Sequence, residues 1–329
     1  MTRTSRREFL AATSALTASA AVGLSGSSAF AQQYPAQDIH FICAFPPGSG
    51  ADVIVRYFAE KVRPLTGKNI IVENRVGAGG NIALEYVARA KPDGYTIFVH
   101  GGNAVAASMS LYKKPPVDVA KAYQMAATIN RQPFMLVVDE KSPYKTTAEL
   151  TKAMLAKGEK ASYATSAPDG TVMGEIYKSV TGVKALEVSY KTASDSINDM
   201  ASGSLDYAMH NPVFALAQQR EGRMRILGVS TAKRLESNPD LPTMGEQGIP
   251  MDLTGWWAAM VPTGTPRPAI DALHKWFSEV VAQADTKKFL NNLGGDQFSI
   301  TPDEAQALFL KDIENWKDYV RVAKLQPQG

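Results

Sequence analysis

Two glycine-rich loops near the start of the chain carry the chemistry of an anion site. They cover residues 45–52 and 73–80, and each follows a short apolar run and precedes a stretch with helical periodicity. Glycine tolerates positive φ, so such loops bring bare backbone N–H groups to the first turn of a helix. The positive end of the helix dipole attracts an anion there without a cationic side chain. The pair of loops predicts a cradle for a carboxylate or a phosphate.

The chain lacks the residue patterns of the common catalytic and metal sites. Its four histidines show neither His-x-His nor His-x-x-x-His spacing, and no acidic metal-ligand cluster accompanies them. Gly-x-Ser-x-Gly, Cys-x-x-Cys and Walker A motifs are missing, and Val53 and Ile82 stand where the third glycine of a Rossmann pattern belongs. We therefore expect no enzyme, no metal and no cofactor. His100 and His210 end predicted strands near the loops, so a binding role stays open for them.

The first 31 residues have the features of an export signal. Residues 5–10, Ser-Arg-Arg-Glu-Phe-Leu, form a twin-arginine signature, and the mildly apolar stretch 10–24 is too short and too polar to span a membrane. Small residues around Ala31 predict cleavage after this residue and export to a bacterial periplasm. Cys43 is the only cysteine, so no internal disulfide forms, and we expect it to be a buried strand residue.

Length and charge narrow the class of partner. The chain has a formal net charge of +3, of which residues 1–31 supply +2, so the mature chain carries 3 − 2 = +1. A nearly neutral chain without a basic cluster is a poor nucleic-acid binder, and we expect no such partner. The mature length of 329 − 31 = 298 residues is sufficient for two ordinary domains.

Apolar periodicity predicts alternating strands and helices in the first part of the chain. Strands are expected at 39–45, 69–73 and 95–99, with helical stripes at 54–65 and 82–90 between them. This βαβαβ order is typical of a parallel or largely parallel sheet with helices on its faces.

A second α/β unit begins near residue 134. Strands are expected at 134–138, 162–165, 205–209 and 225–230, and helices after the capping box Thr146-x-x-Glu149, from about 172 to Gly182, and after a Ser194 cap. The remaining tail is almost wholly helical and too short to be a domain, so we expect it to pack on the first unit. The predicted fold is α/β with two lobes, each a mixed sheet flanked by helices around an interdomain cleft. Lobe 1 covers 32–131 plus 256–329, and lobe 2 covers 132–255.

Short motifs along the mature chain resemble a known family. They are Tyr34-Pro35, Phe45-x-Pro-Gly-x-Gly-x-Asp52, Val72-Glu-Asn-Arg75, Gly77-Ala-Gly-Gly80, Pro92-Asp-Gly-Tyr-Thr96, Leu241-Pro-Thr243, Glu246-x-Gly248, Trp257 and Pro262-x-Gly-x-Pro266. Together they are similar to the Bug-type periplasmic solute receptors of tripartite tricarboxylate transporters. The resemblance implies a type II-like, two-lobed binding protein that closes on a carboxylate, uses no cofactor and delivers the ligand to a membrane permease.

The resemblance also implies where the ligand lies. In that family the two glycine loops hold one carboxylate, largely through backbone N–H groups and water. Asp52 and Arg75 either touch the ligand or only support these loops. The loop 166–171, Ser-Ala-Pro-Asp-Gly-Thr, departs from the family's Gly-Ser-rich pattern, although Thr171 can cap the next helix. Asp169 puts a negative charge near the distal end of the ligand, which leaves room for a monocarboxylate, an aromatic acid or a ligand with an amino or amide group.

These considerations define one candidate site and three candidate roles. The ligand-binding residues are expected to be Phe45, Pro47, Gly48, Ser49, Gly50, Ala78, Gly79, Gly80, Asn103, Ser166, Asp169, Gly170, Thr171, Tyr190 and His210. We expect a monomer that captures a small carboxylate for the permease subunits of a transporter. Presentation of the ligand to a sensor kinase and hydrolysis of small acids in the periplasm are the alternatives.

Overall fold

The computed structural model describes residues 34–328, so the predicted export signal and its cleavage site after Ala31 lie outside the described residues. The described residues from 37 onward form one compact unit. Within the described part, none of the helices combines the length and the apolar character that crossing a membrane requires.

A six-stranded sheet organises the first lobe. Its strands lie in the order β11 (Asp296–Gln297), β4 (Tyr123–Gln132), β10 (Gly255–Pro262), β3 (Thr96–Gly101), β1 (Ile39–Cys43) and β2 (Ile70–Asn74). β1 pairs in parallel with β2 and β3, which confirms the predicted βαβαβ unit, whereas β10 runs antiparallel to β3 and β4. The carboxyl ends of β1, β2 and β3 therefore meet at one edge of the sheet, where both glycine loops emerge.

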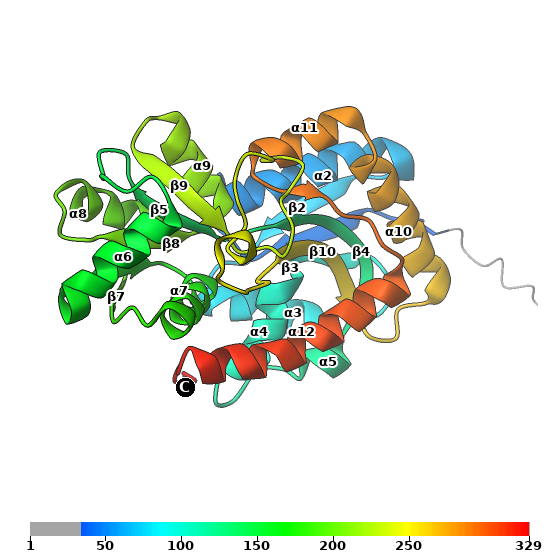
Figure 1. Ribbon diagram of the computed structural model, residues 1–329. Coiled ribbons are helices and arrows are strands. Elements are labelled where there is room, and N and C mark those ends of the chain that lie inside the picture. Colours follow the sequence, from blue (N-terminus) through cyan, green and yellow to red (C-terminus); the bar gives the residue numbers. More distant parts are fainter. Residues whose placement is uncertain (1–33, 329) are drawn as a thin grey trace, which may run out of the picture. The chain divides into compact units, whose positions relative to one another are not determined.

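Helices cover both faces of this sheet (Figure 1). One face carries α2 (Gly50–Thr66), α10 (Arg267–Val281) and α11 (Ala284–Asn292); the other carries α3 (Asn81–Ala88), α4 (Gly102–Leu111), α5 (Val119–Ala122) and α12 (Pro302–Val322). Side chains of successive strand residues point to opposite faces of the sheet. Phe41 packs against Phe277 of α10, with ring centroids 5.5 Å apart, while Ile42 joins the core beneath α3 and α4.

A five-stranded mixed sheet organises the second lobe. Its order is β7 (Leu186–Ser189), β6 (Ser162–Thr165), β8 (Tyr207–His210), β5 (Met135–Asp139) and β9 (Met224–Val229), and its helices are α6 (Thr147–Lys157), α7 (Pro168–Thr181), α8 (Ile197–Ala201) and α9 (Pro212–Arg220). β5 is antiparallel to both neighbours, and β6 is parallel to both of its own. The predicted capping box of Thr146 and Glu149 is present at the start of α6.

Two predicted caps are wrong. A 3₁₀ turn at Ala193–Ser196 precedes α8, so the capping box moves upstream to Thr192 and Asp195, and Ser194 caps nothing. α7 begins at Pro168, four residues before the predicted start, because proline suits the first helical position. Thr171 therefore lies inside the helix, and Ala167 is the N-cap.

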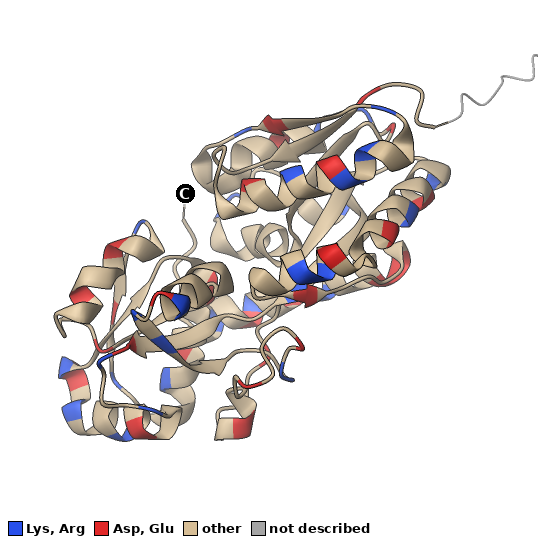
Figure 2. Cartoon of the chain, turned by 90° about the horizontal axis from the view of Figure 1, so that it is seen from above, with Lys and Arg blue, Asp and Glu red and all other residues tan. Residues whose placement is uncertain are grey.

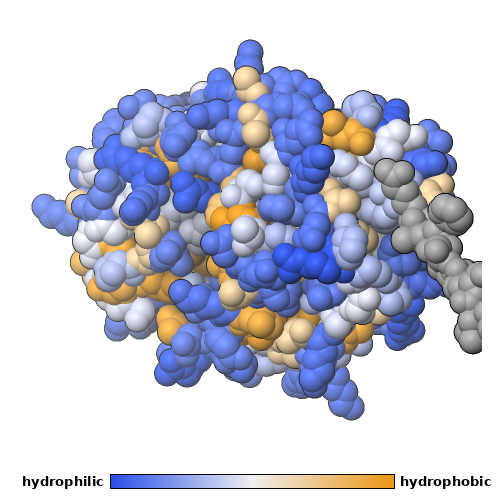
Figure 3. Space-filling model, turned by 90° about the vertical axis from the view of Figure 1, so that its right-hand side faces the viewer, coloured by the Kyte–Doolittle hydropathy of each residue, from blue (hydrophilic) through white to orange (hydrophobic). Residues whose placement is uncertain are grey.

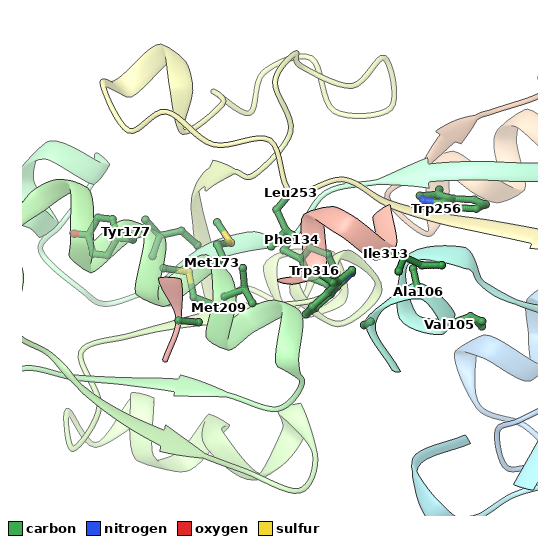
Figure 4. Close-up of a cluster of buried hydrophobic side chains, with 14 of the residues drawn as sticks. Val105, Ala106, Phe134, Met173, Tyr177, Met209, Leu253, Trp256, Ile313 and Trp316 are labelled. Atoms are coloured by element: carbon green, nitrogen blue, oxygen red, sulfur yellow. The ribbon is translucent and has the colours of Figure 1, made fainter. Parts of the chain in front are cut away.

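The core is continuous between the two lobes. Figure 4 shows Met173, Tyr177 and Met209 from the second lobe approaching Phe134 and Trp316, with Val105, Ala106, Trp256 and Ile313 beyond. Trp316 belongs to α12, which packs on α4 and β4 and also reaches α7. The C-terminal helix thus contacts both lobes, as its path in Figure 1 illustrates.

The outer surface carries charges of both signs. Lys and Arg side chains alternate with Asp and Glu along the helices in Figure 2, and no stripe of one sign is visible in that view. The face in Figure 3 is mainly hydrophilic, with its apolar areas interrupted by polar residues.

Candidate functional site

A cavity of about 220 Å³ lies where the second glycine loop meets the second lobe. The first lobe contributes Gly79, Gly80 and residues of β3, α3, α4 and α12, and the second lobe contributes Pro168 and Asp169 from the first turn of α7. Three predicted site residues, Gly79, Gly80 and Asp169, thus line one cavity. A small solute held there touches both lobes.

The backbone of the second glycine loop forms a concave nest. φ is positive at four consecutive residues, with values of 135° at Gly77, 46° at Ala78, 65° at Gly79 and 97° at Gly80. The N–H of Gly80 donates to the carbonyl of Gly77 over 2.9 Å, so the donors that this nest offers to an anion are those of Ala78 and Gly79. Ala78 is strained, because a side chain rarely adopts positive φ. Strain of this kind is characteristic of functional loops.

Three helices begin at this cavity without a side-chain cap. They are α3, α4 and α7, whose N-cap residues are Gly80, Gly101 and Ala167. By contrast, α2, α6, α9 and α12 are capped by Ser49, Thr146, Asn211 and Thr301. α10 and α11 also lack such a cap, but none of their residues lines the cavity. The positive ends of α3 and α4 are left to attract an anion, whereas the first turn of α7 already carries the carboxylate of Asp169.

Asp169 connects the two lobes. Asn103 at the start of α4 donates a hydrogen bond from Nδ2 to Oδ1 of Asp169 over 3.1 Å, and Oδ1 of Asn103 accepts from the backbone N–H of Trp256. Burial raises the pKa of Asp169 to about 6, helped by the negative charge of Asp312 on α12. The carboxylate is therefore mostly ionised at neutral pH, although its surroundings disfavour the charge.

Replacing Asp169 by Asn should flatten the pH dependence of stability. The pKa of Asp169 is higher in the folded protein than in the unfolded chain, so folding favours the protonated form, and stability falls as pH rises from about 4 to 6. We expect the wild type to lose about 1–2 kcal/mol more than Asp169→Asn over this range. The other groups near Asp169, namely Asp312, Tyr319 and His100, are common to both proteins. Urea denaturation at each pH measures the free energy of unfolding of both proteins. If this free energy changes with pH equally in the wild type and in Asp169→Asn, the pKa of Asp169 is not raised by folding.

Aromatic rings support the cavity from the first lobe. His100 lines it and stacks on Phe45, with ring centroids 5.0 Å apart, and it also contacts Phe98 and Trp257. Burial lowers the pKa of His100 to about 4, so the ring is neutral at pH 7. Phe45 thus lies next to the cavity without lining it.

The first glycine loop is fixed by Asp52, which is 1% exposed. Its carboxylate accepts hydrogen bonds from the backbone N–H of Gly48, from Nε of Arg56 and from Nδ2 of Asn74 over 2.7–2.8 Å. Asn74 also donates to the carbonyl of Phe45, which joins this loop to the end of β2. Burial opposes ionisation of Asp52, but the three hydrogen bonds outweigh it and hold its pKa below the usual range. Asp52 therefore supports the loop.

The remaining residues of the first loop lie near the second lobe rather than in the cavity. Ser49 caps α2, Pro47 and Gly48 are exposed, and Gly50 faces Val213 of α9. Arg75 lies elsewhere, since it lines a shallow pocket with His40 and stacks on Tyr86, 3.3 Å from the ring centroid. It also pairs with Glu73 at 2.7 Å, which indicates a supporting role.

The second lobe places five of its predicted site residues away from the cavity, and His210 is one of them. Ser166 and Thr171 line a separate pocket, and the Thr171 hydroxyl donates to Glu187 over 2.5 Å. Tyr190 donates to Asp199. Gly170 packs closely on β8, where an added Cβ would lie 2.8 Å from the carbonyl oxygen of Met209.

His210 is 1% exposed and forms a hydrogen bond through Nε2 with Ser196, 3.1 Å away. The Ser196 hydroxyl donates to the carbonyl of Ala193, so Nε2 carries the proton, and Nδ1 has no hydrogen-bond partner within residues 34–328. Burial lowers the pKa of His210 to about 4. Since Ser196 is fully buried as well, a substrate cannot reach this Ser–His pair, and its geometry does not favour hydrolysis.

Several residues that line the cavity were not predicted from the sequence. Leu111 and Tyr112 at the end of α4 and Trp316 of α12 all line the cavity. α4 is rich in small residues and begins at a glycine, so neither a cap nor a clear apolar stripe marks it. Trp316 lies on a helix that was expected, but which of its faces meets the cleft depends on tertiary packing.

Comparison with known proteins identifies the family. Residues 54–325 match the family model described as Tripartite tricarboxylate transporter family receptor. The chain belongs to this family. Its family and fold are those of periplasmic solute-binding receptors rather than of enzymes, and the resemblance seen in the sequence is confirmed.

Individual relatives of this receptor cover nearly the whole chain. BugT of Bordetella pertussis (strain Tohama I) is 27% identical over 295 residues, which make up 88% of this chain and 90% of BugT. The structure of the periplasmic binding protein BugD is 27% identical, with a TM-score of 0.75 over 90% of this chain and 100% of BugD. R. palustris Rpa4515, solved with adipate, is 26% identical, with a TM-score of 0.78 over 88% of this chain and 98% of its own.

Proposed function

We propose that this receptor captures a small carboxylate between its lobes and delivers it to the permease subunits of a tripartite tricarboxylate-type transporter. The observation that carries the proposal is the convergence of the uncapped N-termini of α3 and α4 and the 77–80 nest on one cavity. Among the described residues that line it there is no Lys or Arg. Backbone N–H groups and helix dipoles then hold the anion. The adipate bound to Rpa4515 supports this class of ligand.

Hinge closure follows from the way the cavity is built. Gly79 and Asp169 belong to different lobes, so a ligand that touches both favours the state in which the lobes are together. The hydrogen bond from Asn103 to Asp169 stabilises the same state. We propose lobe boundaries of 32–131 plus 256–329 and 132–255, a monomeric receptor without cofactor or catalytic activity, and periplasmic export through the twin-arginine signal. The site in this proposal centres on Gly79, Gly80, Asn103 and Asp169.

A melting-temperature screen of small acids tests the proposed function. A ligand that binds only the folded protein stabilises it by RT ln(1 + [L]/Kd), about 2.7 kcal/mol at a hundredfold excess over Kd, which is worth several degrees. We expect at least one mono-, di- or tricarboxylate or aromatic acid to give this shift and to be recovered unchanged after prolonged incubation. A sugar or metal ion that stabilises the protein when no carboxylate does would refute the proposal. Turnover of the stabilising acid would refute it as well.

A further inference from the structure

The cavity contains one charged side chain and, among the described residues that line it, no charged side chain of opposite sign. Asp169 is the only acidic or basic residue among the described residues that line the cavity, and His100 beside it is held neutral by burial. The only side chain in the described part of the chain that donates to Asp169 is the uncharged amide of Asn103. A second carboxylate, that of Asp312, disfavours the charge of Asp169 further, because its own negative charge raises the pKa of Asp169. A negative charge enclosed in this way strongly favours a cation beside it.

The two ends of the cavity therefore favour different chemical groups on the ligand. The 77–80 nest offers the backbone donors of Ala78 and Gly79 to an anion, whereas Asp169 offers acceptor oxygens. A ligand with a carboxylate at both ends would place one of them against Asp169, where like charges repel in a poorly solvated space. A ligand with an ammonium group at that end instead gains a charge-assisted hydrogen bond.

Much of the wall of this cavity is apolar, although the polar side chains of Asn81, Ser108 and Tyr112 line it as well. The apolar part is formed by Leu84, Phe98, Val105, Leu111 and Trp316, of which Leu84, Phe98, Val105 and Trp316 are at most 4% exposed. Side chains of this kind pack against methylene groups and offer no partner to a polar substituent. The apolar share of the wall accordingly suits a ligand whose middle is mostly hydrocarbon.

We propose that Asp169 makes this receptor selective for linear amino acids whose amino group lies at the end of the chain opposite the carboxylate, and that the same residue excludes dicarboxylates. This inference rests on the proposed function, because it assumes that the carboxylate occupies the 77–80 nest. It assigns to Asp169 a role in specificity that goes beyond holding the lobes together.

Calorimetry at pH 7.5 with matched ligands tests this selectivity. The probes are 4-aminobutanoate, 5-aminopentanoate and 6-aminohexanoate, each compared with the dicarboxylate and the monocarboxylate of equal chain length. We expect at least one amino acid to bind ten times or more tightly than its dicarboxylate partner. Asp169→Asn should weaken the amino acid at least tenfold and strengthen the dicarboxylate, because the amide keeps the shape and loses the charge. Asp318→Asn, at an exposed Asp of α12 paired with Arg321, is the matched control and should change neither affinity.

A second variant keeps the charge and moves it. Asp169→Glu extends the carboxylate by one methylene into the cavity, so the preferred amino acid should become one carbon shorter. Dicarboxylate binding equal to or tighter than amino acid binding in the wild type would overturn the inference. An unchanged ligand ranking in folded Asp169→Asn and Asp169→Glu would overturn it too, and in both cases the proposed function survives because a carboxylate still binds. If none of these probes binds while another acid of the melting-temperature screen does, the inference fails and the proposed function stands. Only if no acid of that screen binds does the proposed function itself fail.

Discussion

Gly79→Val should lower the affinity for the carboxylate ligand by about a hundredfold, an effect of about 2.7 kcal/mol. Gly79 has a φ of 65°, which a β-branched residue adopts only with strain. An added Cβ would also lie 3.0 Å from the Tyr112 hydroxyl, so the loop or Tyr112 has to move. Either movement turns the N–H groups of the nest away from the anion, and a lost hydrogen bond to a charged group costs about 1.5–3 kcal/mol. Calorimetry with the tightest acid from the screen measures the change.

Gly222→Val is the matched control for this experiment. Gly222 has a φ of 66°, nearly the same as that of Gly79, but an added Cβ meets nothing within 4 Å, and the residue does not line the cavity. Both variants should therefore lose similar stability through backbone strain, while only Gly79→Val loses binding. Equal affinity of the two variants for the ligand would show that the anion lies outside the 77–80 nest.

The sequence predicted elements best where apolar runs are short and bounded by turns. The strand expected at 162–165 is β6, and the parallel unit of β1, β2 and β3 was expected from its βαβαβ order. β4 was missed, although it is the longest strand of the first sheet. It combines apolar residues with buried polar ones such as Thr128 and Asn130, so neither alternation nor a continuous apolar run marks it. Its place between β10 and β11 is determined by tertiary pairing.

The loops of the candidate site could be predicted from the sequence, whereas most of the side chains that line its cavity could not. Glycine spacing marked the 77–80 nest, and a change of charge in the second-lobe loop marked Asp169, which both line the cavity. Closeness in sequence to a residue that lines the cavity did not predict which other residues line it. Thr171 lies only two residues after Asp169 but turns toward Glu187, because successive helical residues face different directions. Trp316 lines the same cavity from more than 140 residues away, which no local pattern records.

Asp52→Ala should destabilise the protein by about 2–3 kcal/mol, although Asp52 does not line the cavity. The substitution removes one carboxylate and leaves three donors, on Gly48, Arg56 and Asn74, without the acceptor that fixes them. These donors lower the pKa of Asp52, so the wild-type carboxylate is ionised at neutral pH and the full loss of stability should be seen there. Urea denaturation of the ligand-free protein at pH 7 measures it.

Arg56→Ala separates the buried acceptor from the ion pair. The Arg56 side chain is 48% exposed, against 1% for Asp52, so water replaces most of what the guanidinium provides. Removing the guanidinium should lower the free energy of unfolding by no more than about 1 kcal/mol, as for other solvent-exposed ion pairs. Equal losses in the two variants would mean that the ion pair, rather than the contacts of Asp52 with Gly48 and Asn74, stabilises the first loop. A larger loss in Asp52→Ala would mean that this carboxylate connects the loop to β2, so that the start of α2 is held in place before any ligand arrives.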